Sequence, residues 1–317
     1  MQKGVKFRIY PNREQQTIIN QTLGCCRLIY NKGLAMRNEA YQNGNKIGYS
    51  QTSAMLTDLK KSDDFAFLKA VDSIALQQSL RDLDRGFVNF FQKRAFHPTF
   101  KSKHNHHQSY RTINQGDNIR IVGKYIKLPK LGFVKIRQTM GAEKINNVTI
   151  ERTPTNKYFA VLNVKFEPQP MSNKGGKIGI DVGIKEFYSD SNGNVVYNPK
   201  YLEKSMRKLI REQRKLSRKE KGSTNRNKQR VKVALVHEKI TNQRNDFLQK
   251  QSTMLIRENQ TICIEDLKVK NMMRNHKLAQ HIGSASWSKF FDMLSYKSIW
   301  YGNDIVKVPT MYPSSQT

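Results

Sequence analysis

Cysteine and acidic residues are both scarce in this 317-residue chain. The cysteines are Cys25, Cys26 and Cys263, which is too few for a disulfide framework, and no CxxC pair of a zinc site occurs. The N-terminal residues also lack the apolar core of a secretion signal. We therefore expect a protein of a reducing compartment, the cytoplasm, in which Cys25 and Cys26 are buried in an apolar helix.

No apolar run approaches the ~20 residues that a membrane-spanning helix requires, so we expect no membrane partner. The 25 acidic residues are outnumbered by 56 lysines and arginines, which gives a formal net charge of +31. Such a chain repels itself unless a polyanion neutralises it, and nucleic acid is the obvious candidate. A membrane surface is the rival, but the basic residues are spread along the chain rather than gathered on one amphipathic helix.

The first half of the chain predicts two structural classes. Residues 11–96 have apolar residues at helical spacing and predict a helical unit, in which Asn12 and Gln15 form a capping box. Short β-like runs separated by turn residues follow and predict a small β-barrel. The runs are 119–122, 125–128, 133–136, 148–152 and 158–166. A strand at 5–9 could belong to this barrel, which would make the helical unit an insertion.

The second half predicts an α/β domain after a linker at 169–176. Its expected elements are a strand at 177–184, a hairpin at 186–198 that turns at Asn192–Gly193, long basic helices within 200–260, a strand at 261–267, a helix at 287–303 and a strand at 304–309. This order is how a ribonuclease H-like domain begins. The predicted class is therefore α+β and multidomain: a β-barrel (1–10 and 97–170), a helical domain (11–96) and an incomplete ribonuclease H-like α/β domain (171–317).

Two carboxylates occupy positions where an apolar strand normally has Ile or Val: Asp181 in KIGIDVGI and Glu265 in TICIEDL. If the two strands are neighbours, both side chains could hold Mg²⁺, whose preferred ligands are oxygens. Two such ions would activate water for phosphodiester hydrolysis, and that geometry usually needs a third acid. A lone Asp before Gly is otherwise often a turn or cap residue. Asp190 and Asp266 fit the latter roles, in a hairpin turn and a cap.

Two basic segments favour contact with nucleic acid. Residues 204–232 have a density of positive charge that would destabilise a solvated helix, although a solvated surface helix is the alternative. The segment 97–111 combines lysines and aromatic residues with four histidines at a spacing that fits no common zinc pattern. We expect contacts from Lys101, Lys103, His104, Arg111, Lys208, Arg211, Arg214, Lys215 and Arg218.

Together these motifs resemble a known family. GIDVGIKEF (179–187) and ICIEDLKVKNM (262–272) are similar to the first two RuvC motifs of the TnpB/OrfB transposon proteins, which are relatives of the type V CRISPR effectors. HEKITNQRNDFLQKQS (237–252) resembles their bridging helix, and the segments 10–34, 97–111 and 126–137 resemble their helical and barrel regions.

The resemblance implies an RNA-guided DNA endonuclease of the bacterial cytoplasm and nucleoid, with a wedge barrel, a helical recognition domain and a RuvC-like domain. Its partners would be a guide RNA from the transposon end and double-stranded target DNA. Asp181 and Glu265 would be the first two catalytic and Mg²⁺-binding acids. Arg27, Lys32 and Arg37 on the first helix, and Arg244 on the bridging helix, would contact nucleic acid.

One departure from the family pattern bears on activity. Members continue from an SSQT-like sequence into a CxxC zinc ribbon and a third acidic motif, and neither is present up to Thr317. We therefore expect a C-terminally truncated nuclease site, weak or lost Mg²⁺ binding, no zinc site and reduced cleavage. The alternatives are a nuclease-dead RNA-guided binder that represses transcription, and a transposase that binds DNA sequence directly through a helix-turn-helix at the N-terminus.

Overall fold

The computed structural model describes residues 1–137, 144–168, 171 and 175–309. These residues lie in two compact units, Met1–Phe166 and Glu167–Thr317, and each is described by itself. None of the described helices is both long and apolar enough to cross a membrane. Most of the predicted linker at 169–176 lies outside the described residues.

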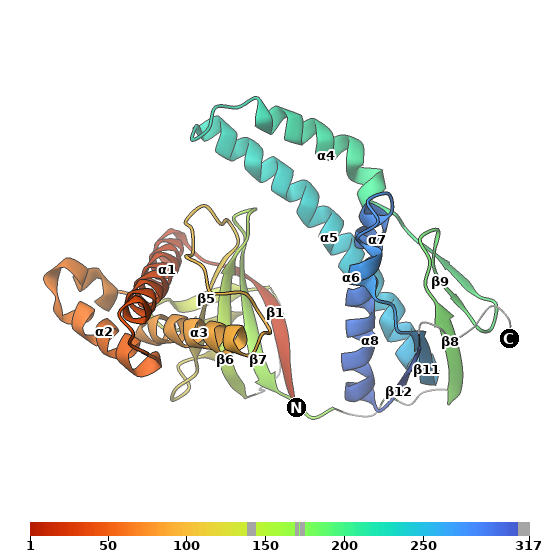
Figure 1. The fold of residues 1–317 in the computed structure, drawn as a ribbon, viewed down its shortest axis with the longest axis horizontal. Helices are drawn as coiled ribbons and strands as arrows, with labels where there is room; N and C mark the ends of the chain where they lie inside the picture. The colour runs from red at the N-terminus through yellow and green to blue at the C-terminus, as the bar shows by residue number, and fades with distance from the viewer. Residues whose placement is uncertain (138–143, 169–170, 172–174, 310–317) are drawn as a thin grey trace. The chain divides into compact units, whose positions relative to one another are not determined.

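The first unit combines helices with a seven-stranded antiparallel sheet (Figure 1). Its elements are β1 (Gln2–Tyr10), α1 (Arg13–Gln42), α2 (Tyr49–Lys61), the 3-10 helix η1 (Asp63–Lys69), α3 (Ser73–Phe91), β2 (Gln108–Ile113), β3 (Arg120–Val122), β4 (Tyr125–Leu128), β5 (Gly132–Ile136), β6 (Ile145–Arg152) and β7 (Tyr158–Lys165). All five predicted β-runs and the strand at 5–9 are present. β2 was not predicted, because its sequence QSYRTI reads as part of the polar segment before it.

Local side-chain contacts start the long helices of this unit. The Asn12 side chain accepts a hydrogen bond from the Gln15 backbone N–H at 2.8 Å, and the Gln15 side chain accepts one from the Asn12 N–H at 3.0 Å. The predicted capping box is therefore confirmed. Asp72 caps α3 by accepting a hydrogen bond from the Ile74 N–H at 2.9 Å. α1 ends before Gly44, whose positive φ is incompatible with a right-handed helix.

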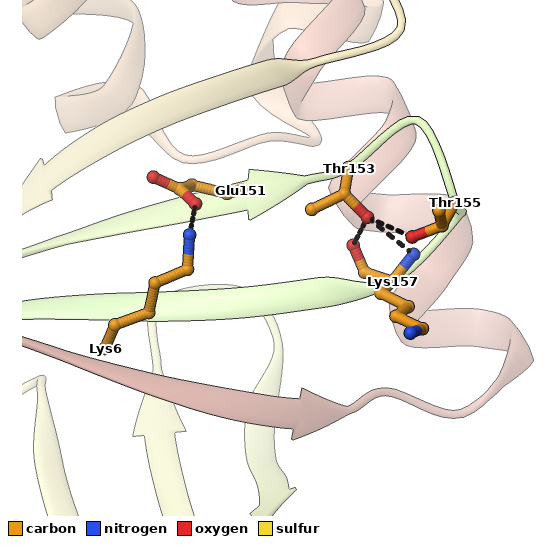
Figure 2. A network of polar contacts seen from close by, with 5 residues as sticks. All are labelled: Lys6, Glu151, Thr153, Thr155 and Lys157. Carbon is orange, nitrogen blue, oxygen red and sulfur yellow. Dashed lines mark hydrogen bonds and ion pairs between the residues drawn. The ribbon is translucent and has the colours of Figure 1, made fainter. Parts of the chain in front are cut away.

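The strand order of the sheet is β2-β6-β7-β1-β5-β4-β3. Among the described strands β2 and β3 are the two edges, so closure into a barrel stays a prediction. The tight β6–β7 connection is held by the Thr153 hydroxyl, which contacts the Thr155 hydroxyl at 2.9 Å and the Lys157 backbone (Figure 2). Asn156 supplies the left-handed residue of this turn.

Helices and sheet of the first unit share one hydrophobic core. Ile19, Leu23 and Cys26 of α1 pack in the same cluster as Leu76 of α3 and Val148 of β6. Cys25 and Cys26 are buried, as the apolar helix predicted. A smaller cluster of Tyr30, Leu34 and Leu83 lies between α1 and α3, but in the main core the apolar face of the helices and the inner face of the sheet cover each other.

The second unit is built on a five-stranded mixed sheet. Its elements are β8 (Gly176–Asp181), β9 (Glu186–Asp190), β10 (Val195–Tyr197), α4 (Tyr201–Ser217), α5 (Thr224–Glu258), β11 (Asn259–Glu265), α6 (Val269–Met272), α7 (Ala279–Ala285), α8 (Trp287–Tyr301) and β12 (Asp304–Val308). The strand order is β10-β9-β8-β11-β12, with β8, β11 and β12 parallel and the β8–β9–β10 pairings antiparallel.

One face of this sheet is covered by α5 and α8 (Figure 1). Ile178 and Ile180 of β8, with Ile262 and Ile264 of β11, pack into the core with Phe290 of α8. The alternate residues of both strands point to the opposite face and are not fully buried. Asp181 and Glu265 are among these alternate residues, so the pleat places both carboxylates on that opposite face.

Candidate functional site

The two predicted catalytic acids lie side by side at one edge of the sheet. β8 and β11 are parallel neighbours, and their register pairs Cys263 with Gly179 and Ile264 with Ile180. Asp181 and Glu265 follow these pairs by one residue and end their strands. The metal hypothesis required the two strands to be neighbours, and they are. Because parallel strands end at the same edge of a sheet, both carboxylates lie at that edge.

A cavity of 320 Å³ opens beside the two carboxylates. Ser189 and Ser191 of the β9 hairpin and Cys263 line it together with Asp181 and Glu265. Burial raises the pKa of the Glu265 carboxyl above its ordinary value, and the negative charge of Asp181 raises it further. The two acids therefore share one electrostatic environment, in which a bound cation would relieve their repulsion.

The neighbouring acids have structural contacts. Asp190 accepts hydrogen bonds from the backbone N–H groups of Asn192 (2.9 Å) and Asn194 (2.8 Å), so it holds the hairpin turn as predicted. Asp266 forms an ion pair with Lys307 at 3.8 Å. Across the described residues, no three His, Cys, Asp or Glu side chains gather closely enough to hold a metal ion. The described part of the chain therefore supplies two acidic ligands, Asp181 and Glu265.

The predicted basic residues of α4 lie on one side of a helical hairpin. α4 and α5 run antiparallel and pack through Leu209, Val236 and Ile240 (Figure 1). Gln229 of α5 donates hydrogen bonds to the Glu212 backbone carbonyl at 3.0 Å and to its carboxylate at 2.8 Å. The bond from Gln229 is the main cause that holds the pKa of the Glu212 carboxyl below its ordinary value.

Beside this contact is a cavity of 420 Å³, which we call the lysine groove. It is lined by five lysines: Lys204, Lys208, Lys215, Lys232 and Lys239. Lys208 and Lys215 were predicted from the sequence. The predicted Arg211 and Arg214 of α4, and Arg218 at its C-terminal cap, do not line the groove and are exposed. Lys204 and Lys232 are the two ends of the basic segment 204–232 that the sequence predicted to contact nucleic acid, although neither was named singly. The position of Lys232 and Lys239 beside α4 could not be predicted, because it depends on how the two helices pair.

Arg37, which was predicted to contact nucleic acid, has structural partners inside the first unit. This residue is buried, its guanidinium forms an ion pair with Asp84 of α3 at 2.5 Å, and it lies over the Phe87 ring at 4.6 Å. It therefore joins α1 to α3 and presents no charge at the surface. The sequence did not indicate this burial, because a basic residue on a helix is usually exposed.

Several other residues that were predicted to contact nucleic acid have partners within the chain, and the rest are exposed or half-buried. Lys32 lies over the Phe65 ring at 4.8 Å, and the Lys101 ammonium lies over the Tyr30 ring at 4.0 Å. Arg111 forms an ion pair with Asp82 at 2.6 Å. The remaining predicted residues lie apart: Arg27 is half-buried on α1, Lys103 and His104 are exposed before β2, and Arg244 is half-buried on α5, where burial lowers its pKa.

Comparison with known proteins identifies the family. A Streptomyces pristinaespiralis protein named as a candidate RNA-guided DNA endonuclease is 40% identical over all of this chain and 79% of its own length. The candidate RNA-guided DNA endonuclease InsQ of Escherichia coli K12 is 33% identical over 98% of this chain and 81% of its own length. The chain belongs to the TnpB/OrfB family. A profile of the OrfB_IS605 family, described as a probable transposase, matches residues 158–276 of this TnpB-type protein.

Two further comparisons concern the fold. A cryo-EM structure of the Cas12f1–sgRNA–target DNA complex contains a chain that superposes with a TM-score of 0.54, covering 98% of this TnpB-family chain and 89% of its own at 12% identity. Residues 1–46 match a family profile described as a helix-turn-helix domain. In the structure these residues form β1 and the single helix α1, so the second helix of such a motif would have to come from beyond residue 46.

Proposed function

We propose that this TnpB-family protein is an RNA-guided DNA-binding protein, with a Mg²⁺-dependent nuclease site at Asp181 and Glu265. The observation that carries the proposal is the adjacency of these two acids on the parallel strands β8 and β11, beside a cavity. The strand order of the sheet is the one expected of a ribonuclease H-like domain. The names of the relatives, which describe RNA-guided DNA endonucleases, support the same reaction.

The side chains at this site are of the kind that binds divalent cations. Two carboxylates at one sheet edge are hard oxygen ligands. Burial, and after it the negative charge of Asp181, raises the pKa of the Glu265 carboxyl, and a bound cation would offset the cost of holding both charges there. When bound, Mg²⁺ would supply Lewis-acid activation of water and of the scissile phosphate. Asp181 and Glu265 would hold it, and the cavity beside them would admit the phosphodiester.

The protein would have nucleic-acid partners and three domains. The guide would be an RNA from the transposon end, and the target would be double-stranded DNA that is selected by pairing with the guide. Residues 1–10 and 97–170 would be the wedge domain, closed as a small barrel, and 11–96 the recognition domain. Both edge strands contact the same hydrophobic core: Tyr110 of β2 belongs to it, and Ile121 of β3 packs against it. This shared core supports a strongly curved sheet. Residues 171–317 would be the RuvC-like domain.

The lysine groove is proposed as a phosphate-binding surface. Five lysines converge on it from two helices, and Glu212 is the acidic residue among its lining residues. Exposed arginines at 211, 214 and 218 continue the same positive charge along α4. A polyanionic backbone would neutralise this density, because each phosphate contact releases a counterion.

The decisive experiment uses the protein purified after co-expression with RNA from its own transposon end. We expect Mg²⁺-dependent cleavage of guide-matched duplex DNA, at a reduced rate because the described residues supply two acidic ligands rather than three, and loss of cleavage in Asp181→Asn and Glu265→Gln. Asp266→Asn is the matched control, since it removes the same charge one residue from Glu265. Mg²⁺ or Mn²⁺ should also raise the melting temperature of wild type and not that of Asp181→Asn, a readout independent of activity.

Other outcomes select the alternatives. RNA-dependent duplex binding without cleavage in any variant would establish a nuclease-dead binder that can act as a repressor. Binding that survives ribonuclease treatment would establish direct recognition of DNA sequence. Cleavage that persists in Asp181→Asn would remove the two acids from the reaction.

A further inference from the structure

The outer face of β1, β5, β4 and β3 carries a regular pattern of aromatic and basic side chains. In the antiparallel register Lys135 of β5 is paired with Tyr10 of β1 on one side and with Tyr125 of β4 on the other. Directly paired residues point to the same face of a sheet. Tyr10, Lys135 and Tyr125 therefore form one row across three strands, with the cation between two rings.

A second row lies two residues away. Phe133 of β5 is paired with Lys127 of β4, and Lys127 is paired with Arg120 of β3. Phe133 and Lys135 are two apart on β5, so the pleat places both rows on the same face. We call the six residues Tyr10, Arg120, Tyr125, Lys127, Phe133 and Lys135 the aromatic–basic face.

This face is opposite the hydrophobic core. The residues between its members, such as Ile126 and Val134, are buried in the core cluster. Its three rings are open to solvent, with 46% of Tyr10, 46% of Tyr125 and 51% of Phe133 exposed. Three large exposed rings on neighbouring strands are unusual in a folded domain, and they carry no part of the core packing that holds the sheet together.

The pattern continues toward β7. The Arg8 guanidinium lies 5.5 Å from the Tyr10 ring centre and 5.2 Å from that of Phe159. Beyond it Lys6 lies 4.7 Å from the Phe159 ring centre and forms an ion pair with Glu151 (Figure 2). Toward β7 the cations are thus already paired with rings or an acid of the chain. Within the aromatic–basic face, Tyr10 has Arg8 beside its ring, yet about half of each of the three aromatic residues stays exposed.

We propose that the aromatic–basic face binds an unpaired segment of RNA, with bases stacked on the three rings and phosphates held by the cations between them. The strands are ~4.8 Å apart, so the rings of Tyr10 and Tyr125 are separated by about 10 Å, which leaves room for two or three bases. Every base has a π-face, so such stacking is sequence-tolerant. The inference rests on the proposed function for the RNA and names the part of RNA that this sheet would take.

Two features favour unpaired RNA over other occupants. Bases within a duplex are stacked on each other and cannot reach a flat sheet, so a duplex would use the cations and leave the rings without a partner. The phenol groups of Tyr10 and Tyr125 add hydrogen-bonding groups at the rim of the face, where a ribose 2′-hydroxyl can pair with them. A protein partner would gain little from the three intervening cations, which it would have to desolvate.

The test is fluorescence anisotropy with the full chain and a labelled twelve-nucleotide oligouridine at fixed salt. We expect Tyr125→Ala and Phe133→Ala each to weaken binding about fivefold, the low end of what a base–aromatic stack contributes, and the double variant about 25-fold. Tyr125→Phe and Phe133→Trp keep a ring and should bind within twofold of wild type. Lys135→Gln should lower the salt dependence, which the ring variants leave unchanged.

Two matched controls remove an exposed apolar side chain elsewhere. Ile113→Ala acts on β2 of the same sheet and Tyr197→Ala on β10 of the second unit, where 37% and 68% of the side chains are exposed. Both should bind like wild type. Circular dichroism verifies that each variant is folded, which surface substitutions of this kind should not disturb.

Each remaining outcome has one meaning. Equal binding by the Tyr125→Ala/Phe133→Ala double variant and wild type overturns the inference. Tighter binding of an oligothymidine or of an RNA hairpin than of oligouridine also overturns it, because the face would then take DNA or a duplex. Guided DNA binding is measured separately. If it is absent while the affinity for oligouridine still depends on the three rings, the proposed function is refuted and RNA binding by the aromatic–basic face stands.

Discussion

Two glycines of α1 offer a sharp test of the packing between α1 and α3. A Cβ atom added at Gly24 would meet no heavy atom within 4 Å. One added at Gly33 would lie 2.8 Å from Leu80 Cδ2 and 3.1 Å from Leu83 Cδ2. Both leucines are buried in the unit's interior, so neither methyl group can move away without displacing others.

The expected effects of Gly24→Ala and Gly33→Ala therefore differ in sign. Alanine at either position gains about 0.5–1 kcal/mol, because glycine loses more backbone entropy in a helix. At Gly24 nothing opposes this gain, and the free energy of unfolding should rise by about that amount. At Gly33 overpacking of a filled core costs about 1–3 kcal/mol, so the net result should be a loss of about 1–2 kcal/mol.

Urea unfolding followed by circular dichroism measures both variants. The two tryptophans, Trp287 and Trp300, belong to the second unit, so their fluorescence should report an unchanged transition and serves as an internal control. If Gly33→Ala proves as stable as Gly24→Ala, the close approach of α1 to α3 does not exist in solution.

Lys297, Arg37 and the lysine groove each allow a further test. Lys297 is 5% exposed, and burial lowers its pKa from 10.5 to about 8, so the unfolded chain binds more protons between these pH values. The free energy of unfolding of wild type, relative to that of Lys297→Met, should therefore rise by about 1–2 kcal/mol from pH 8 to 10.5, with solvent screening allowed for. If the difference between the two proteins does not change with pH, the pKa of Lys297 is not lowered. Arg37→Ala should cost about 2 kcal/mol in urea unfolding through loss of the pair with Asp84, without altering the salt dependence of RNA binding; a lower salt slope would mean that Arg37 contacts phosphate. Lys232→Gln/Lys239→Gln in the lysine groove should reduce the slope of log affinity against log salt by about 1.5 in anisotropy titrations, and an unchanged slope would exclude the groove from phosphate contact.

Local features of the sequence were sufficient to predict most elements. The Asn12–Gln15 capping box, the hairpin turn before Gly193 and the strands that carry Asp181 and Glu265 each depend on residues a few positions apart. Physical chemistry acts at this range through backbone preference, capping and apolar periodicity, all of which are written in the order of residues. β2 escaped prediction because its polar side chains hide the alternation that packing later imposes.

Burial of single polar residues was beyond such reasoning. Arg37 has the spacing of an exposed helical arginine, and only the arrival of Asp84 from another helix places it in the interior. Lys297 is similar: its ammonium donates to the hydroxyl groups of Ser252 and Thr253, each at 2.7 Å, and these lie more than forty residues earlier on α5. A charge is buried only where partners from elsewhere satisfy it, so its environment is a property of the fold.

The sequence by itself therefore determined the elements, the excess of positive charge and the two acids that stand in apolar strands. Only the tertiary structure decided which of these meet: the register that sets Asp181 beside Glu265, the pairing of α4 with α5 that forms the lysine groove, and the strand order that lines up Tyr10, Lys135 and Tyr125. The physical reason is that periodicity assigns each side chain to a face of its own element, whereas the neighbour across that face comes from distant chain and is selected by packing of the whole unit.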